Sequence, residues 1–274
     1  KSVIIPSVMP KPDVVALTGG YRRTPILQIG ADIYCDTSLI CEVLDHKQPE
    51  PVLYPPHLKG VSRVFAQWAD STLFWTAMAY NMQPKGVAAL FAKLPPEAGA
   101  AFAEDREAMS VNMTRLRTQD AAPAYRSYLR RIAHMAEEHD FLFGIAPCVA
   151  DFAAYHPLWF TRVCTPSVAD VFDHVPAVLE WMDRIAALGH GRMERFTAQD
   201  AITVAAGAEP LPHMSDVFQD EHGIALGSEV TVAPESFGPE ATQGTLVAAT
   251  RTRYILRRED PRAGTVNVHF PRIG

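Results

Sequence analysis

The stretch RRTPILQIGADIYCDTSLI, residues 22–40, decides the fold of the first part of this chain. Two short runs rich in β-branched and aromatic residues, PILQI and DIYC, flank a glycine-containing turn and therefore predict a β-hairpin. Pro25 stands at the first position of the first strand, where a residue without an amide donor is tolerated. Asp36 and Thr37 end the second strand and lead into TSLICEVLDHK, residues 37–47, which we expect to form a helix.

The segments before and after this hairpin extend the pattern. SVIIP, residues 2–6, predicts a further strand, and PDVVAL, residues 12–17, predicts a short helix that closes at a glycine pair. Residues 1–48 thus have the order strand, helix, strand, strand, helix. The next segment, residues 49–57, contains PEPVLYPP. Because proline fixes φ and lacks an amide donor, we expect an extended linker there.

Helical periodicity dominates residues 58–205. Apolar side chains recur at spacings of three, four and seven residues in at least five segments, which is typical of amphipathic helices in an all-α bundle. LPPEAGAAF, residues 94–102, should interrupt this region once. AITVAAGAEPLPHM, residues 201–214, should connect it to the last part of the chain.

The last part, residues 206–274, contains four short strand patterns, SEVTVAP, GTLVAAT, RYILRR and TVNVHF, bounded by Gly and Pro. Val266, Val268 and Phe270 alternate with polar residues, which predicts a sheet with one buried face. We expect either a small β-rich module or a β-rich extension packed on the helical domain. The arginine-rich stretch RTRYILRREDPR is interpreted as charged strand edges rather than as a nucleic-acid surface.

Composition limits the classes of function. The chain has 274 residues, of which 48% are hydrophobic and 20% charged, and its net charge is −6. These values are typical of a soluble globular protein of about two domains, and the mild acidity argues against binding to nucleic acids or anionic membranes. No apolar run reaches the length of a membrane-spanning helix. The four cysteines and ten histidines lack the spacing of metal sites or of a disulfide framework, which favours a cytoplasmic protein without a metal.

Local physical chemistry gives the end of the hairpin two possible roles. Asp36 directly precedes an apolar-periodic helix and is a good N-cap, which is the simpler interpretation. Alternatively, the Asp36 carboxylate and the Thr37 hydroxyl, together with the first amides of the helix, form a receptor for an α-amino-acid head group. A cis Thr24–Pro25 bond would turn the Thr24 peptide groups outward, where they could pair with an extended peptide. The residues alone favour the cap and leave the receptor open.

The order of these motifs resembles the glutathione transferase superfamily over residues 1 to about 200. TPIL stands where the family has its cis-proline, and DT stands where it has an acidic residue followed by Ser or Thr. Over a hundred residues later, GIAPCVADFAAY, residues 144–155, is similar to the motif that starts a buried helix in the family. The individual motifs are short, and their order and spacing carry the resemblance.

The resemblance implies an α/β thioredoxin-like domain followed by an all-α bundle domain and a β-rich extension, as in some bacterial members. Residues 1–48 correspond to a glutathione-binding domain that lacks its first strand and first helix, residues 49–57 to the linker, and residues 58–205 to the helical domain. Residues 206–274 form an extension without an assigned role. Because the family's thiol-activating residue lies near the start of the missing helix, the catalytic residue is unknown and is expected to precede Lys1.

The resemblance also implies a binding site. Thr24 would pair through its main chain with the cysteinyl part of glutathione, beside a cis Pro25. Asp36 and Thr37 would hold the γ-glutamyl end. Arg23 stands where many relatives have a basic residue near the glycyl carboxylate or the γ-glutamyl group, although a solvated surface arginine explains it equally well.

Further residues fall on other motifs of the family. Four aromatic residues stand where relatives line the pocket for the electrophile, with core packing as the alternative for each: Trp68, Phe74, Trp75 and Tyr80. Cys148 and Asp151 would form a structural helix cap, in which Asp151 reaches back to the Cys148 amide although a thiol is a weak acceptor. Cys35 is interpreted as a packed thiol, because a neighbouring carboxylate raises the pKa of a thiol.

These features together imply a cytoplasmic glutathione-dependent transferase of the detoxification type, which conjugates or exchanges the glutathione thiol with a small electrophile. Glutathione would be its substrate and a homodimer its assembly, with no metal and with neither a nucleic acid nor a membrane as partner. Two alternatives remain open, since a fold does not determine an activity. One is a non-catalytic binding or scaffold protein with the same fold, and the other is a glutathione-dependent thiol-disulfide reductase.

Overall fold

The computed structural model describes residues 1–92, 94–212, 217–219 and 221–272. It divides into two compact units, each with its own hydrophobic core. The first, which we call the sheet unit, comprises Lys1–His46, Ala100–Met113 and Arg192–Gly274. The second, which we call the helical unit, comprises Lys47–Gly99 and Thr114–Gly191.

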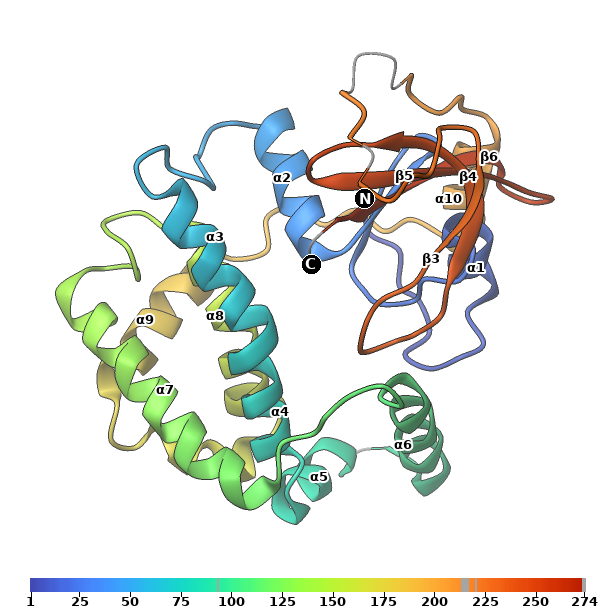
Figure 1. The fold of residues 1–274 in the computed structure, drawn as a ribbon. Helices are drawn as coiled ribbons and strands as arrows, with labels where there is room; N and C mark the ends of the chain where they lie inside the picture. The colour runs from blue at the N-terminus through green and yellow to red at the C-terminus, as the bar shows by residue number, and fades with distance from the viewer. Residues whose placement is uncertain (93, 213–216, 220, 273–274) are drawn as a thin grey trace. The chain divides into compact units, whose positions relative to one another are not determined.

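The sheet unit is built on one mixed sheet with the strand order β1-β2-β6-β5-β4-β3 (Figure 1). The strands are β1 (Ile26–Ile29), β2 (Asp32–Cys35), β3 (Glu229–Val232), β4 (Thr242–Ala249), β5 (Arg253–Asp260) and β6 (Gly264–Pro271). Neighbouring strands are antiparallel except β2 and β6, which are parallel. The C-terminal strands, expected to form a module or to pack on the helical domain, instead continue the sheet of the N-terminal hairpin, because β6 pairs with the second edge of β2.

Three helices pack on this sheet: α1 (Pro12–Thr18), α2 (Thr37–Lys47) and α10 (Ala198–Ala206). α1 and α10 cover one face, where alternate strand residues such as Ile33 and Val268 are fully buried. α2 covers the other face, where its Leu39 packs with Tyr34 of β2. Burial of apolar surface on both faces is what joins the helices to the sheet.

β6 differs from the prediction of a half-buried strand. Asn267 and His269, the polar residues of its alternation, are both 0% exposed. The register of β6 with β2 sets His269 opposite Tyr34, and the two rings stack with their centroids 4.2 Å apart. His269 Nε2 lies 2.7 Å from Asp32 Oδ1. Asn267 Nδ2 donates to the Leu211 carbonyl (3.4 Å), so each of these buried polar side chains has a hydrogen-bonding partner, which offsets part of the cost of leaving water.

Two predictions at the ends of the sheet unit were wrong. SVIIP forms no strand, and only Ser2 bridges to Arg195, because no strand among the described residues lies alongside to supply the other hydrogen bonds. The segment 201–214 does not begin as a connector, because its first six residues complete α10. Thr197 caps this helix by accepting a hydrogen bond from the Asp200 amide (3.0 Å). Residues 213–214 of the segment lie outside the described residues.

The helical unit contains the helices that the apolar periodicity predicts. Its elements are α3 (Lys59–Trp68), the π-helical turn η1 (Ala69–Leu73), α4 (Phe74–Asn81), α5 (Pro84–Phe91), the start of α6 (Pro96–Met109), α7 (Thr118–Glu138), α8 (Val149–Trp159), the π-helical turn η2 (Phe160–Cys164), the 3-10 helix η3 (Pro166–Phe172) and α9 (Pro176–Ala187). α6 begins inside the segment 94–102 that should have interrupted the helices, since proline fits the first turn of a helix. From Ala100 onward α6 belongs to the sheet unit.

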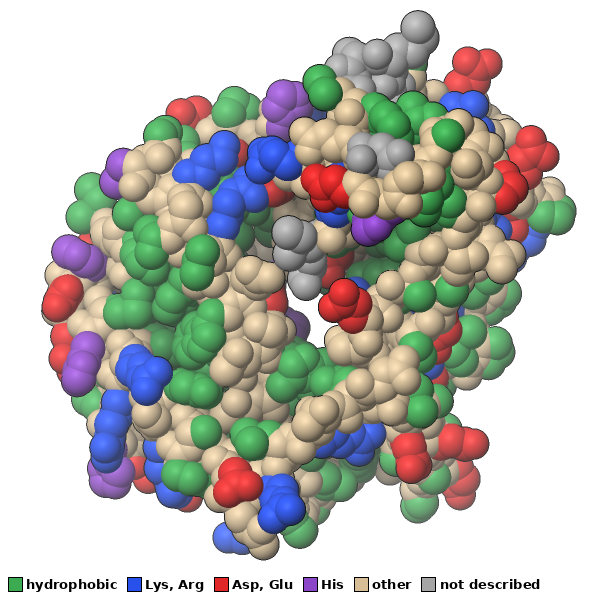
Figure 2. Space-filling model, in the orientation of Figure 1, with side chains coloured by type: hydrophobic (Ala, Val, Ile, Leu, Met, Phe, Trp, Pro, Cys, Tyr) green, Lys and Arg blue, Asp and Glu red, His purple; other side chains and the backbone are tan. Residues whose placement is uncertain are grey.

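The core of the helical unit is formed by large side chains from several helices. Tyr125, Phe172 and Trp181 are at most 2% exposed and belong to one hydrophobic cluster. Val61 and Val64 on α3 are instead 49% and 68% exposed. Figure 2 shows hydrophobic side chains gathered on the face of this unit where α3 lies. The periodic pattern of α3 therefore marks an apolar surface as well as a buried one.

Candidate functional site

The residues predicted to bind glutathione meet at the open end of the β1–β2 hairpin. The register pairs Ile26 with Cys35, which sets the residues before β1 beside those after β2. Five predicted residues gather there: Arg23, Thr24, Pro25, Asp36 and Thr37. The Thr24–Pro25 peptide bond is cis, and both residues are exposed.

Asp36 is the N-cap of α2 and has an unusual backbone. Its φ is 77°, the one positive value at a non-glycine residue in the described part of the chain, and aspartate is among the few residues that tolerate this region. Its Oδ1 accepts hydrogen bonds from the Ser38 amide (3.0 Å) and the Ser38 hydroxyl (2.9 Å). Its carbonyl accepts one from the Ile40 amide (3.0 Å). Asp36 thus caps the helix with one of its two carboxylate oxygens.

The second carboxylate oxygen of Asp36 faces Arg23. Its Oδ2 lies 3.7 Å from Arg23 Nη2, and the Arg23 guanidinium also lies 5.2 Å from the centroid of the Tyr21 ring. Arg23 is therefore paired and packed rather than freely solvated. Together with the exposed Thr37, the surface presents an anionic oxygen, a hydroxyl and a helix N-terminus. That combination matches the charges of an α-amino-acid head group.

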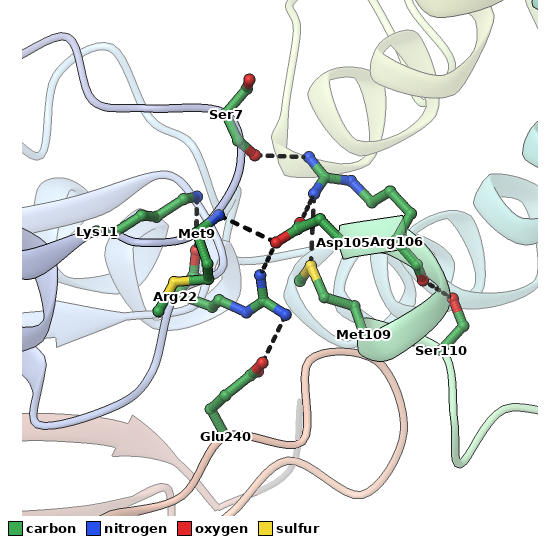
Figure 3. Close-up of polar contacts among 9 residues, drawn as sticks. All are labelled: Ser7, Met9, Lys11, Arg22, Asp105, Arg106, Met109, Ser110 and Glu240. Atoms are coloured by element: carbon green, nitrogen blue, oxygen red, sulfur yellow. Dashed lines mark hydrogen bonds and ion pairs between the residues drawn. The ribbon is translucent and has the colours of Figure 1, made fainter. Parts of the chain in front are cut away.

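Behind this surface, a buried ion network fixes the residue that precedes Arg23 (Figure 3). The Arg22 side chain is 3% exposed, and its Nη1 lies 2.5 Å from Asp105 Oδ1 on α6. Its Nη2 lies 2.6 Å from Glu240 Oε1, between β3 and β4. We call Arg22, Asp105 and Glu240 the Arg22 network. Lys11 Nζ donates to the Arg22 carbonyl over 3.5 Å.

The charges in this region shift one another's pKa. Burial raises the pKa of Asp105, but hydrogen bonds from the Met9 amide (3.0 Å) and from Arg22 outweigh burial and hold the pKa below its ordinary value. Burial and the nearby Arg106 lower the pKa of Lys11. Sequence reasoning missed the Arg22 network, because Asp105 stands 83 positions from Arg22 and no local motif marks either residue.

The thiol nearest the hairpin end is not a reactive group. Cys35 is 0% exposed, and burial, reinforced by Asp36, raises its pKa well above the ordinary value. Burial also raises the pKa of Cys148 to about 11. Thiols with a raised pKa hold little thiolate at neutral pH and are poor nucleophiles. The structure thus agrees with the interpretation of Cys35 as a packed thiol.

Aromatic residues predicted to line an electrophile pocket belong to the helical unit and have different neighbours. Trp68 contacts Tyr128 edge-on, with ring centroids 5.3 Å apart. Phe74 contacts Trp75 edge-on at 4.9 Å and stacks on His156 at 5.6 Å. Burial lowers the pKa of His156, so this ring is neutral at pH 7. The π-helical turn η1 separates Trp68 from the others, and such turns are frequent at functional sites.

Tyr80 lies deeper than the other predicted aromatic residues. It is 4% exposed, and its hydroxyl donates to the Val168 carbonyl (3.0 Å). Burial and the nearby Asp170 raise its pKa. It borders a polar pocket of about 180 Å³ whose walls come from the end of α4, the start of α5, α7 and η3. The other three predicted aromatic residues are not among the described residues that line this pocket.

Asp151 starts α8 with three buried hydrogen bonds. Its carboxylate accepts from the amides of Cys148 (2.9 Å) and Leu142 (2.8 Å) and from Nε1 of Trp181 (2.9 Å). Asp151 is 0% exposed, and the Cys148 side chain completes a capping box. The motif ties the start of α8 to α9, and this role is structural.

Two kinds of feature are absent from the described residues. No group of three or more His, Cys, Asp or Glu side chains is arranged there to hold a metal ion. No helix within the same ranges combines the length and the apolar character needed to cross a bilayer.

Comparison with known proteins identifies the family. The model of the glutathione S-transferase N-terminal domain matches residues 1–52. A GST-like protein from Pseudomonas syringae, whose crystal structure is known, is 38% identical; the match covers 100% of this chain and 87% of that one, with a TM-score of 0.81. The chain therefore belongs to the glutathione S-transferase superfamily and has its thioredoxin-like and helical domains, with a C-terminal β extension.

Two further solved structures match part of the chain. A glutathione S-transferase domain-containing protein from Marinobacter aquaeolei is 21% identical; the match covers 61% of this chain and 73% of that one, with a TM-score of 0.45. A glutathione S-transferase from Rhodospirillum rubrum is 17% identical; the match covers 65% and 72%, with a TM-score of 0.47. A comparison with curated proteins gave no match.

Proposed function

We propose that this protein binds glutathione at the open end of the β1–β2 hairpin and transfers its thiol to a small electrophile. Family membership supports a glutathione-related function in general. The observation that carries the more specific proposal is Asp36, which caps α2 with one oxygen and turns the other towards Arg23, beside the exposed Thr24. A cap alone does not require a left-handed backbone, which costs about 1–3 kcal/mol at a non-glycine residue.

Each group has a role set by its chemistry. The Thr24 main chain, next to Pro25, pairs with the cysteinyl peptide unit of glutathione. The Thr37 hydroxyl and the first amides of α2 donate to the γ-glutamyl carboxylate, and Asp36 accepts a hydrogen bond from the ammonium group. Arg23 pairs with Asp36 in the structure, and it balances the charge of the site when the head group is bound.

In the transfer step, the glutathione thiolate forms a bond to an electrophilic carbon, and the leaving group departs with its bonding electron pair. The thiol proton passes to solvent before the attack. The thiol nearest the site, Cys35, is buried with a raised pKa and is not assigned to thiol activation, and the activating residue stays unassigned. The contribution of the hairpin is therefore binding and orientation.

The electrophile is proposed to bind against aromatic side chains of the helical unit. Phe74 and Trp75 fit this role best, because both are partly exposed and their rings are in contact. Trp68 is also partly exposed. Tyr80 fits it least, because it is 4% exposed and its hydroxyl is engaged by a carbonyl.

We also propose that the protein is a cytoplasmic homodimer. Val61 and Val64 on α3 leave apolar surface uncovered, and monomeric proteins seldom expose large apolar patches. Sedimentation equilibrium measures the assembly directly. A mass of two chains supports the proposal, and a single-chain mass at micromolar concentration contradicts it.

Titration calorimetry with reduced glutathione tests the binding site. Asp36→Asn keeps an acceptor for the cap and the tolerance of positive φ, but it removes the charge that faces the ammonium group. We expect its Kd to rise about 10–100-fold, because a hydrogen bond to a charged group contributes about 1.5–3 kcal/mol. Thr37→Ala should raise the Kd about 3–10-fold. Asp183→Asn is the matched control, since it breaks an Arg162–Asp183 pair (2.7 Å) in the helical unit and should leave the Kd unchanged.

Product analysis with a generic aryl halide and, in a separate assay, with a glutathione mixed disulfide separates the three candidate functions. A glutathione conjugate detected by mass spectrometry supports the transferase. Glutathione binding without any turnover supports a scaffold protein, and reduction of a mixed disulfide without conjugation supports a reductase. Absence of binding at millimolar glutathione contradicts the transferase and the reductase and leaves the scaffold protein, which need not bind glutathione.

A further inference from the structure

The Arg22 network joins three segments that are far apart in the sequence. Arg22 lies two residues before Thr24, Asp105 lies on α6, and Glu240 lies between β3 and β4, on residues 233–241, which we call the β3–β4 loop (Figure 3). Both carboxylates contact the same guanidinium, over 2.5 and 2.6 Å. The C-terminal extension therefore forms an ion pair with the segment that leads into the proposed glutathione site.

The β3–β4 loop also packs on the backbone that precedes the network. A Cβ atom at Gly20 would lie 2.1 Å from the Ala241 carbonyl oxygen, so only glycine permits this approach. At the start of β4, Thr242 accepts a hydrogen bond from the Tyr21 amide (3.4 Å) and donates one to the Thr18 carbonyl (2.9 Å). The extension thus holds this stretch through its backbone as well as through charge.

The same loop reaches the next residue, Arg23. Gly238 has a φ of 67° and donates its amide to the Met109 carbonyl on α6 (2.7 Å). A Cβ atom at Gly238 would lie 3.0 Å from Met109 Cε and 3.3 Å from Arg23 Cγ. Arg23 in turn faces Asp36. A continuous line of contacts therefore runs from the β3–β4 loop to the proposed head-group receptor.

We infer that Glu240 is a positioning residue for glutathione, which acts through Arg22 to set the backbone of Arg23 and Thr24. The inference rests on the proposed function and gives the C-terminal extension a part in it. Glu240 is not a catalytic residue, because its Oε1 is occupied by Arg22 and its role is exerted through that side chain.

The burial of Arg22 makes this coupling effective. Its side chain is 3% exposed, and its Nε has no hydrogen-bond partner among the described residues, so the two terminal nitrogens carry its contacts with acceptors. Neutralising Glu240 would leave Nη2 without a carboxylate. A buried cation that loses a counter-charge shifts towards water or towards its remaining partner. Any such shift is transmitted to Thr24, which is only two residues further along the chain.

The test compares Glu240→Gln with a matched control, Glu221→Gln. The control removes the same charge from the same extension, where Glu221 pairs with Arg272 at 3.2 Å. For Glu240→Gln we expect the Kd and the KM for glutathione to rise about 5–20-fold, as for the partial loss of a charge-assisted hydrogen bond. The kcat at saturating glutathione should stay within about twofold of wild type. For Glu221→Gln none of these values should change.

Two further readouts separate positioning from a general loss of fold. Glu240→Asp keeps the negative charge on a shorter side chain, and its Kd should lie between those of wild type and Glu240→Gln. The amide resonance of Thr24 in the glutathione-free protein should move in Glu240→Gln and stay in place in Glu221→Gln. A merely structural role would lower the melting temperature without this localised change.

The outcomes are distinct. A wild-type protein that binds no glutathione refutes the proposed function, and Glu240 then has nothing to position. A wild-type protein that binds glutathione, together with an unchanged Kd in both Glu240 variants, refutes the inference alone. If Glu240→Gln does not fold, the Glu240→Asp variant decides, and an unchanged Kd in that variant again refutes the inference.

Discussion

Replacing Asp105 with asparagine should destabilise the sheet unit at neutral pH. The Asp105 side chain is 7% exposed and faces the equally buried Arg22. Removing one partner of a buried ion pair costs about 3–5 kcal/mol. Glu240 still compensates Arg22 in this variant, and asparagine keeps an acceptor for the Met9 amide. We therefore expect the free energy of unfolding to fall by about 2–3 kcal/mol.

The destabilisation caused by Asp105→Asn should become smaller as the pH falls. The pKa of Asp105 in the folded protein lies below its ordinary value, because hydrogen bonds from the Met9 amide and from Arg22 outweigh burial. The unfolded chain has an aspartate pKa of about 3.9. A group with a lowered folded-state pKa stabilises fully above the unfolded-state pKa and loses this effect as the pH falls through the folded-state value. Wild type and Asp105→Asn should therefore differ most above about pH 5 and converge only as the pH falls through the folded-state pKa of Asp105, which lies below its ordinary value.

Hydrogen exchange in increasing denaturant measures the sheet unit selectively. The four tryptophans all lie outside it, so their fluorescence reports the helical unit. Peptides from β4, β5 and β6 give the opening free energy of the sheet unit at each pH. Asp183→Asn, an exposed ion-pair control, should stay within about 0.5 kcal/mol of wild type. An Asp105→Asn variant as stable as wild type at pH 7, or a difference that grows in acid, would refute the reasoning.

Two further predictions concern the helical core and the thiols. Trp181→Phe removes the hydrogen bond from Nε1 to Asp151 (2.9 Å) and should lower the free energy of unfolding by about 1–3 kcal/mol, because a buried carboxylate loses a donor. Urea unfolding followed by circular dichroism measures this change. An unchanged unfolding midpoint would contradict the prediction. In the native protein, iodoacetamide should modify Cys41 and Cys164, which are partly exposed, before it modifies Cys35 and Cys148, which are buried. Peptide mass spectrometry gives the order, and early labelling of Cys35 would show that it is not a packed thiol.

The hairpin and its helix could be predicted because their signals are local. PILQI and DIYC became β1 and β2, and TSLICEVLDHK became α2 with the same bounds, Thr37–Lys47. Turn chemistry and capping act over a few residues, so a short stretch of sequence contains them. The gathering of Thr24 with Asp36 follows from the register of that one hairpin.

The pairing of distant segments could not be predicted in the same way. The alternation of β6 shows which residues share a face, but it does not show that β6 runs parallel to β2. The polar face of β6 is buried because His269 meets Asp32 and Tyr34, which lie more than 200 positions earlier in the chain. SVIIP has the composition of a strand, and Ser2 still forms only one bridge, because a strand needs a neighbour as well as a propensity.

The candidate site likewise has a part that could be predicted from local sequence and a part that could not. Its front, from Arg23 to Pro25 and at Asp36, was visible in short motifs and in their order. The contacts of Arg22 with Asp105 and Glu240 could not be predicted, because nothing in the local sequence marks either acidic residue and only the fold brings them together.

The most direct test of a glutathione site at the hairpin end is an amide chemical-shift map of the whole chain titrated with reduced glutathione. We expect the largest shifts at Thr24, Thr37 and Ser38, which all saturate with the Kd found by calorimetry. The same titration of Asp36→Asn should need a glutathione concentration about 10–100-fold higher. No shifts at millimolar glutathione, or shifts confined to the helical unit, would contradict the site.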